Sequence, residues 1–327
     1  MIQLPELSER VLIGDRKAVS RAISSIENHD KGSDDLLKRL FPHTGHAFTI
    51  GVTGPPGTGK SSLVDRMVKI YRTEGKKVGV LAVDPTSPVS GGAILGDRVR
   101  MIEHSLDPGV YIRSMASRGD EGGLSRAARN AIRVLDAAGN DIIIAETVGI
   151  GQAEVEIVQV ADLVIVVLMP ELGDEIQAIK AGLMEIGDIF AINKSDLPGS
   201  DKVIYNLETV LGKKDNWDQA AIKVSAKTGE GIEELMSLVE KYHTTLANSE
   251  AARKRRLANL SEELIRNVGF VLSQRAEESL RGNKALETIV SKVASRQLDP
   301  ESATKLLVET VTSNHANPHR RAPRKGA

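Results

Sequence analysis

The segment from residue 54 to residue 61 constrains the fold more than any other part of the chain. It fits the pattern G-x-x-x-x-G-K-[ST] and reads Gly54-Pro55-Pro56-Gly57-Thr58-Gly59-Lys60-Ser61. The apolar run Phe48–Val52 comes directly before it, and residues at helical spacing follow it. A strand, a glycine-rich loop and a helix in this order are the setting in which the pattern binds phosphate. The segment therefore predicts a P-loop in an α/β fold.

The residues of this loop have different tasks. Glycines allow successive backbone N–H groups to point at phosphate oxygens, and the start of the helix adds further unpaired N–H groups. We expect Lys60 to reach the β- and γ-phosphates, and the Ser61 hydroxyl to bind Mg²⁺. The predicted nucleotide contacts cover the whole loop: Gly54, Pro55, Pro56, Gly57, Thr58, Gly59, Lys60, Ser61 and Ser62.

Short apolar runs alternate with helical stretches after residue 46, which predicts a mainly parallel sheet with helices on both faces. Residues 1–45 show helical spacing and predict an N-terminal helical extension. Residues 246–327 predict a C-terminal helical segment with a basic tail that we expect to be disordered, and residues 46–245 predict the P-loop domain. The predicted strands are Phe48–Val52, Val78–Val83, Val110–Ile112, Ile142–Ala145, Leu163–Leu168, Ile189–Ile192 and Ala221–Val224.

A second motif selects the base of the nucleotide. Asn193-Lys194-Ser195-Asp196 follows an apolar strand, which places it at the ligand-binding edge of such a sheet. The carboxylate of Asp196 offers two acceptors to the N1–H and N2 amine of guanine, a donor pair that adenine lacks. We expect Lys194 to lie over the base and Asn193 to tie loops together. Ser225-Ala226-Lys227 ends the next strand and could supply a backbone amide to guanine O6. GTP or GDP is therefore the predicted nucleotide.

Carboxylates between these two motifs are candidates for the metal site. Asp84 ends the second predicted strand, Asp97 lies in the loop beyond it, and Glu146 ends the strand at residues 142–145. In many GTPases an aspartate that holds Mg²⁺ through water occupies the position of Glu146. Gly149 would present its N–H to the γ-phosphate. Mg²⁺ prefers oxygen ligands and keeps several waters, so one serine and nearby carboxylates suffice. A loop-capping role remains open for the two aspartates.

Composition narrows the other possibilities. The formal net charge is −1 and aromatic residues make up 3% of the chain, which argues against nucleic acid as a partner. The longest apolar stretch, Leu163–Met169, is too short to span a bilayer, so no membrane partner is expected. The chain has no cysteine, which excludes thiolate metal sites and is consistent with a reducing cytoplasm. No signal peptide is evident at the N-terminus, and we expect a cytoplasmic protein.

At these residues the chain resembles the MeaB/ArgK family of P-loop GTPases, relatives of the human methylmalonic aciduria type A protein. The most specific stretch is Glu146-Thr147-Val148-Gly149-Ile150-Gly151-Gln152, because a glutamate at its head is uncommon among GTPases. Asp120-Glu121 departs from the family pattern, which leaves the partner contacts there open. The resemblance extends nearly end to end and also rests on Gly54–Ser62, Val83–Pro88, Gly96–Arg98, Ile112–Ala116, Arg118-Gly119, Gly122–Leu124 and Asn193–Asp196.

The resemblance implies a function and further site residues. It implies Mg²⁺-dependent GTP hydrolysis, with the metal held or positioned by Ser61, Asp84, Asp97 and Glu146. It implies a third switch near residues 170–180, where Gln177 and Lys180 are associated with partner-stimulated hydrolysis. Members act as G-protein chaperones that gate adenosylcobalamin loading, protection or reactivation of methylmalonyl-CoA mutase or a related B12-dependent acyl-CoA mutase. They form homodimers through C-terminal helices, and the apolar stripe from Leu257 to Leu272 suits that role or packing on the chain's own GTPase domain.

Two other functions remain alternatives. A GTPase metallochaperone that delivers nickel would share the fold, but its usual cysteine and histidine clusters are not evident, and His43 and His46 read as loop residues. A kinase linked to amino-acid transport is disfavoured by the guanine-reading motif. No arginine finger can be assigned, and we expect Arg98, Arg113 and Arg118 to anchor loops or lie at the surface. Unassisted hydrolysis is therefore expected to be slow.

Overall fold

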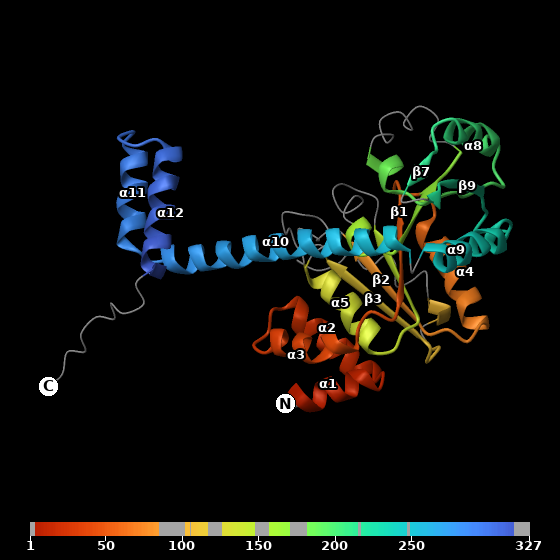
Figure 1. Ribbon diagram of the computed structural model, residues 1–327, viewed down its shortest axis with the longest axis horizontal. Coiled ribbons are helices and arrows are strands. Elements are labelled where there is room, and N and C mark those ends of the chain that lie inside the picture. Colours follow the sequence, from red (N-terminus) through yellow and green to blue (C-terminus); the bar gives the residue numbers. More distant parts are fainter. Residues whose placement is uncertain are drawn as a thin grey trace. The chain divides into compact units, whose positions relative to one another are not determined.

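A seven-stranded sheet carries the glycine-rich loop in the computed structural model (Figure 1). Neighbouring strands are parallel throughout, in the order β3-β2-β4-β1-β5-β6-β9. All the predicted strands are present, and the α/β fold class is confirmed. The strands are β1 (Phe48–Thr53), β2 (Val78–Asp84), β3 (Val110–Ala116), β4 (Ile142–Thr147), β5 (Leu163–Leu168), β6 (Ile189–Ile192) and β9 (Ala220–Lys223).

The structure describes residues 4–84, 102–104, 106–116, 126–147, 157–170, 182–214, 217–246 and 249–316. The chain divides into two compact units, Met1–Lys254 and Arg255–Ala327. The sheet and the helices around it belong to the first unit. The predicted boundaries after residues 45 and 245 stay predictions, since the division by contacts falls elsewhere.

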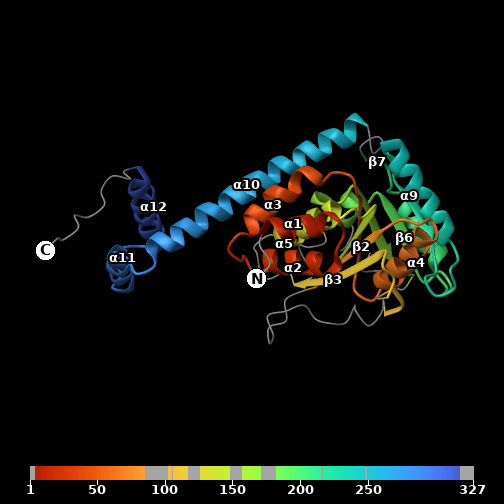
Figure 2. The ribbon, with the colours of Figure 1, turned by 90° about the horizontal axis from the view of Figure 1, so that it is seen from below.

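Helices cover both faces of the sheet because its strands are apolar on both sides. Successive residues of a strand point to opposite faces, and in β1 Ile50 and Val52 join the core beneath α4 (Lys60–Thr73) and α9 (Ile232–Leu246). Figure 2 shows α4 and α9 together at one side of the sheet. On the opposite face, Val164 and Val166 of β5 join the core that includes α8 (Ser200–Glu208). The helix α5 (Arg126–Ala137) also packs on that face, against β2 and β4.

Three short helices precede the sheet and pack onto α5 (Figure 1). They are α1 (Leu4–Leu12), α2 (Arg16–Glu27) and α3 (Ser33–Leu40), followed by the 3₁₀ turn η1 (Phe41–His43). Asp15 caps α2 by accepting hydrogen bonds from the N–H groups of Lys17 and Ala18. Buried side chains from all three helices share one apolar cluster with β2, β3 and β4. These helices are therefore an integral part of the first unit.

The remaining small elements were not expected from the sequence. β7 (Lys213–Lys214) and β8 (Trp217–Asp218) form an antiparallel pair outside the main sheet. The 3₁₀ turns η2 (Ile102–His104) and η3 (Ile157–Gln159) lie between strands. Two-residue strands carry too short a pattern for periodicity to identify.

The second unit is helical, as predicted for this part of the chain. It contains most of α10 (Glu250–Leu280), together with α11 (Lys284–Ala294) and α12 (Pro300–Ala316), which pack on each other. Asp299 caps α12 by accepting from the N–H of Ser302 at 2.9 Å. None of the helices in the described ranges combines the length and the apolar character that crossing a membrane requires.

Candidate nucleotide-binding site

The predicted nucleotide motifs lie at or just beyond the carboxyl ends of four strands of the sheet. Glu146 lies near the end of β4, the glycine-rich loop follows β1, and Asn193 follows β6. Ser225 comes shortly after β9 at the next position of the sheet. Because the strands are parallel, their carboxyl ends meet at one edge. The loop for phosphate therefore lies between a carboxylate on one side and the base-reading motif on the other.

The loop's backbone fits only glycine at two positions. Gly54 has φ 137° and Gly59 has φ 88°, values that side chains rarely adopt. A Cβ atom at Gly54 would collide with the backbone of Val167 in β5, and one at Gly59 would collide with the side-chain amide of Asn193. Gly59 also precedes α4, whose first turn has no side-chain cap. The start of α4 therefore lies at the loop, where the prediction expects helix N–H groups to contribute to an anion site.

Lys60 lies inside this loop. It is 6% exposed, and its Nζ donates to the carbonyl oxygens of Gly54 at 2.8 Å and Pro55 at 2.9 Å. The Thr58 hydroxyl also donates to Pro55 O, at 2.9 Å. A buried ammonium held by its own loop stays close to the backbone N–H groups expected to bind phosphate. The contact of Lys60 with phosphate stays a prediction.

Ser61 and Glu146 come together from different elements. The Ser61 hydroxyl donates to Glu146 Oε1 at 2.6 Å, and both side chains are buried, with 4% exposed in each case. The next residue of β4, Thr147, donates through its hydroxyl to that of Thr53 at 2.9 Å and so fixes β4 beside β1. A buried carboxylate beside a hydroxyl forms an oxygen-only donor pair, which is the type that Mg²⁺ selects. The two residues therefore fit the predicted metal.

The other predicted catalytic and metal residues cannot be placed. Asp84 ends β2, but its side chain is not described, and Asp97, Gly149, Gln177 and Lys180 lie outside the described residues. Within the described ranges, no group of three or more His, Cys, Asp and Glu side chains could hold a metal ion. The roles assigned to these five residues stay predictions.

The base-reading segments are joined by hydrogen bonds through Asn193. Its Nδ2 donates to Thr58 O at 2.8 Å, and its Oδ1 accepts from the Ala226 N–H at 3.0 Å. Asn193 is 2% exposed, so these bonds are shielded from water. The predicted role of Asn193, tying the loops together, matches this geometry.

Asp196 is exposed and held in position by Ser225. The Ser225 hydroxyl donates to Asp196 Oδ1 at 2.7 Å, and this hydrogen bond holds the pKa of the Asp196 carboxyl below its usual value. The acid therefore remains an ionised acceptor across the physiological range. Lys194 has φ 60° and its Nζ approaches Met169 Sδ at 3.4 Å. Lys227 is exposed beside this group.

Arginine contacts were not predicted in detail from the sequence. Arg113 forms a salt bridge with Glu27 and donates to Ser24 Oγ at 3.1 Å, so it fastens α2 to β3. Arg113 therefore anchors α2, as expected. Arg98 and Arg118 lie outside the described residues. Arg66 of α4 donates to two carbonyl oxygens of the segment 225–227. The position of Arg66 in the helical pattern of the sequence did not indicate this long-range contact.

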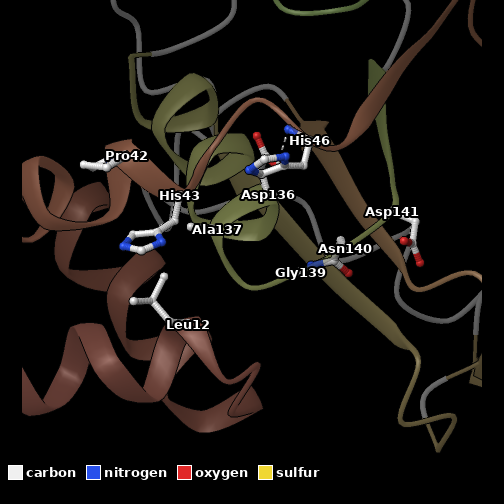
Figure 3. A pocket seen from close by; sticks show the side chains of 9 residues that line it. All are labelled: Leu12, Pro42, His43, His46, Asp136, Ala137, Gly139, Asn140 and Asp141. Carbon is white, nitrogen blue, oxygen red and sulfur yellow. Dashed lines mark hydrogen bonds between the residues drawn. The ribbon is translucent and has the colours of Figure 1, made fainter.

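A separate cavity of about 450 Å³ lies at the opposite edge of the sheet, where β1 and β4 begin. Figure 3 shows His43 beside Leu12 and Pro42, whereas His46 lies next to Asp136. The Asp136 carboxylate accepts from the backbone N–H groups of residues 45–47 and so stabilises this turn. The two imidazoles therefore do not converge on one point.

Comparisons with known proteins place this chain in a family. The family model described as "Methylmalonyl Co-A mutase-associated GTPase MeaB" matches residues 16–280. A protein of Pyrococcus horikoshii whose name describes it as a GTPase is 45% identical over 95% of this chain and 99% of its own length. The mouse protein named methylmalonic aciduria type A homolog, mitochondrial, is 35% identical over 82% of this chain and 66% of its own.

A solved structure supports the fold. The crystal structure titled LAO/AO transport system kinase aligns with a TM-score of 0.71 and 27% identity, covering 95% of this chain and 99% of that one. The family match spans most of the chain, and the sheet has the P-loop GTPase architecture. This chain therefore belongs to the MeaB family and is a GTPase.

Proposed function

We propose that this GTPase is a G-protein chaperone of an adenosylcobalamin-dependent acyl-CoA mutase, either methylmalonyl-CoA mutase or a relative. It gates the loading, protection or reactivation of the mutase's cofactor in response to the bound nucleotide. The observation that carries the proposal is the family match over residues 16–280, whose description names association with that mutase. The mouse relative's name, which refers to methylmalonic aciduria, adds support.

In this proposal each part of the site has a defined task. The loop from Gly54 to Ser62 binds the phosphates, with Lys60 as the cation on the β- and γ-phosphates. Ser61 and Glu146 hold Mg²⁺ directly or through water, with Asp84 and Asp97 as further candidates. The metal supplies positive charge to the phosphate oxygens when bound. The base contacts come from Asn193, Lys194, Asp196, Ser225, Ala226 and Lys227.

Partner control follows from what hydrolysis requires. Charge spreads over the γ-phosphoryl oxygens in the transition state, so positioned cations and an oriented water do most of the catalysis. We assign Gly149 to the γ-phosphate and Gln177 and Lys180 to the partner-dependent step. A mutase that orders these segments would raise the rate of hydrolysis.

Affinity capture tests the proposal. The tagged full-length protein, loaded with GDP or with a non-hydrolysable GTP analogue, is expected to retain an adenosylcobalamin-dependent mutase from its native extract in a nucleotide-dependent amount. The purified mutase should then raise the turnover of GTP by at least about tenfold. Capture without any such enzyme, together with no stimulation by methylmalonyl-CoA mutase, would contradict the chaperone role.

We also propose a homodimer built on α10. This helix has no buried residue, and an apolar stripe runs along one side of it. Burial of a large apolar side chain stabilises an interface by about 1.5–3 kcal/mol, so a second copy could gain considerably from this stripe. The exposed residues of the stripe are Leu257, Leu260, Leu264, Ile265, Val268, Val271 and Leu272.

Introducing a charge into the stripe tests the dimer. Leu264→Glu is expected to convert a dimer to a monomer, because the carboxylate would lose its water on association. Ser273→Glu adds the same charge to the other side of α10 and should leave the dimer intact. Light scattering after size exclusion measures both masses. A wild-type monomer, or a dimer that tolerates Leu264→Glu, would count against this interface.

A further inference from the structure

Arg66 joins the phosphate-binding helix to the base-reading segment. It lies on α4, six residues after Lys60. Its Nε donates to Ala226 O at 2.8 Å, and its Nη2 donates to Lys227 O at 3.0 Å. The planar guanidinium presents its donors in a fixed fork, so two contacts to consecutive carbonyls restrict both position and orientation. This side chain therefore does more than cover the surface of the helix.

The first of these contacts sets the direction of an amide. The Ala226 carbonyl and the Lys227 N–H belong to one peptide unit, which is planar and trans. In such a unit the N–H points away from the C=O. Because Arg66 holds the Ala226 carbonyl toward α4, the Lys227 N–H points in the opposite direction. Arg66 thus fixes the direction of the Lys227 N–H, a backbone donor.

The other anchors of this segment hold different groups. Asn193 accepts from the Ala226 N–H at 3.0 Å. The Ser225 hydroxyl donates to Asp196 and accepts from the Thr228 N–H at 3.2 Å. These bonds fix the peptide units on either side, but they do not contact the Ala226 carbonyl oxygen. Among these contacts, the hydrogen bond from Arg66 is therefore the one that orients the peptide unit between Ala226 and Lys227.

We propose that Arg66 is a positioning residue for base recognition, which orients the Lys227 N–H to donate to the oxygen at position 6 of guanine. Guanine accepts at that position, whereas adenine carries an amine there that would face the donor. Asp196 reads the other edge, at positions 1 and 2. This inference rests on the proposed assignment of residues 193–196 and 225–227 as the base contacts.

Nucleotide analogues separate the two edges of the base. Wild type is compared with Arg66→Ala for binding of GDP, of 6-thio-GDP, whose sulfur is a weak acceptor at position 6, and of IDP, which lacks the amine at position 2. Arg66→Ala should lower the affinity for GDP by about tenfold, which corresponds to the loss of one hydrogen bond. The affinity for 6-thio-GDP should fall by much less. The preference for GDP over IDP should stay unchanged. Arg66→Lys replaces the guanidinium fork with a single donor group, so its affinity for GDP should lie between those of the wild type and Arg66→Ala.

Matched variants make the outcome decisive. Arg72→Ala, on the same helix, removes a two-donor pair with Asp107 (2.8 and 3.0 Å) away from the base segment and should leave all three affinities alone. Asp196→Asn should instead change the preference between GDP and IDP. Equal weakening of the three nucleotides by Arg66→Ala, or no weakening, would overturn the role of Arg66. An unaltered preference in Asp196→Asn would overturn the assignment of the base contacts.

Discussion

Asp196→Asn is expected to change the preferred base from guanine to xanthine. The wild-type carboxylate offers only acceptors, and its lowered pKa keeps it ionised. Asparagine replaces one acceptor with an NH₂ donor, which faces the N2 amine of guanine but matches the carbonyl that xanthine carries there. Sites that read a base by hydrogen bonds discriminate strongly against a mismatched group. The affinity for GDP should fall by about 100-fold or more, while that for XDP rises.

The change can be measured by competition between GDP and XDP for the purified protein. Asp201→Asn is the matched control, because Asp201 is an exposed aspartate on α8 that pairs with Lys223 rather than with the base segment. The preference of the Asp201→Asn variant for GDP over XDP should equal that of the wild type. The Ser225 hydroxyl can still donate to the amide oxygen at position 196, so the local fold should survive. Retained GDP preference in a folded Asp196→Asn variant would remove Asp196 from base recognition.

The sequence predicted the sheet well because its signals are local. The strands of the sheet are short and mainly apolar, and every residue is buried in β1, β4, β5 and β6. Parallel strands covered by helices produce such runs, and the polar motifs mark where they end. The contact between Ser61 and Glu146 joins two motifs that were each predicted for the metal. Strand order alone is enough to bring them to one edge.

Contacts between distant side chains could not be predicted in the same way. Arg66 and Arg113 have ordinary positions in a helix and a strand, and only the tertiary fold shows that they reach the base segment and α2. An arginine donates to any carbonyl or carboxylate within reach, so its spacing in the sequence carries no information about its partner. The N-terminal helices illustrate the same limit. Their apolar faces were visible, but their packing on α5 was not.

Glu146→Gln is expected to reduce Mg²⁺-dependent GTP hydrolysis by about 100- to 1,000-fold. The carboxylate is 4% exposed and accepts from the Ser61 hydroxyl at 2.6 Å, so its charge lies where a cation would compensate it. Glutamine keeps the shape and an acceptor for Ser61 but removes the charge that attracts Mg²⁺. Binding of GDP in the presence of a chelator should therefore change little. Turnover measured across a magnesium titration reports the effect.

A double variant tests whether the two residues act on one ion. Ser61→Ala should also reduce the magnesium-dependent rate, and Ser61→Ala with Glu146→Gln should cost little more than the worse single change, because groups that serve one ion are not additive. Glu234→Gln, an exposed change on α9, is the matched control and should leave turnover unaltered. Thermal unfolding checks that each variant is folded. Full additivity, or a magnesium response in Glu146→Gln equal to that of the wild type, would place the metal away from this pair.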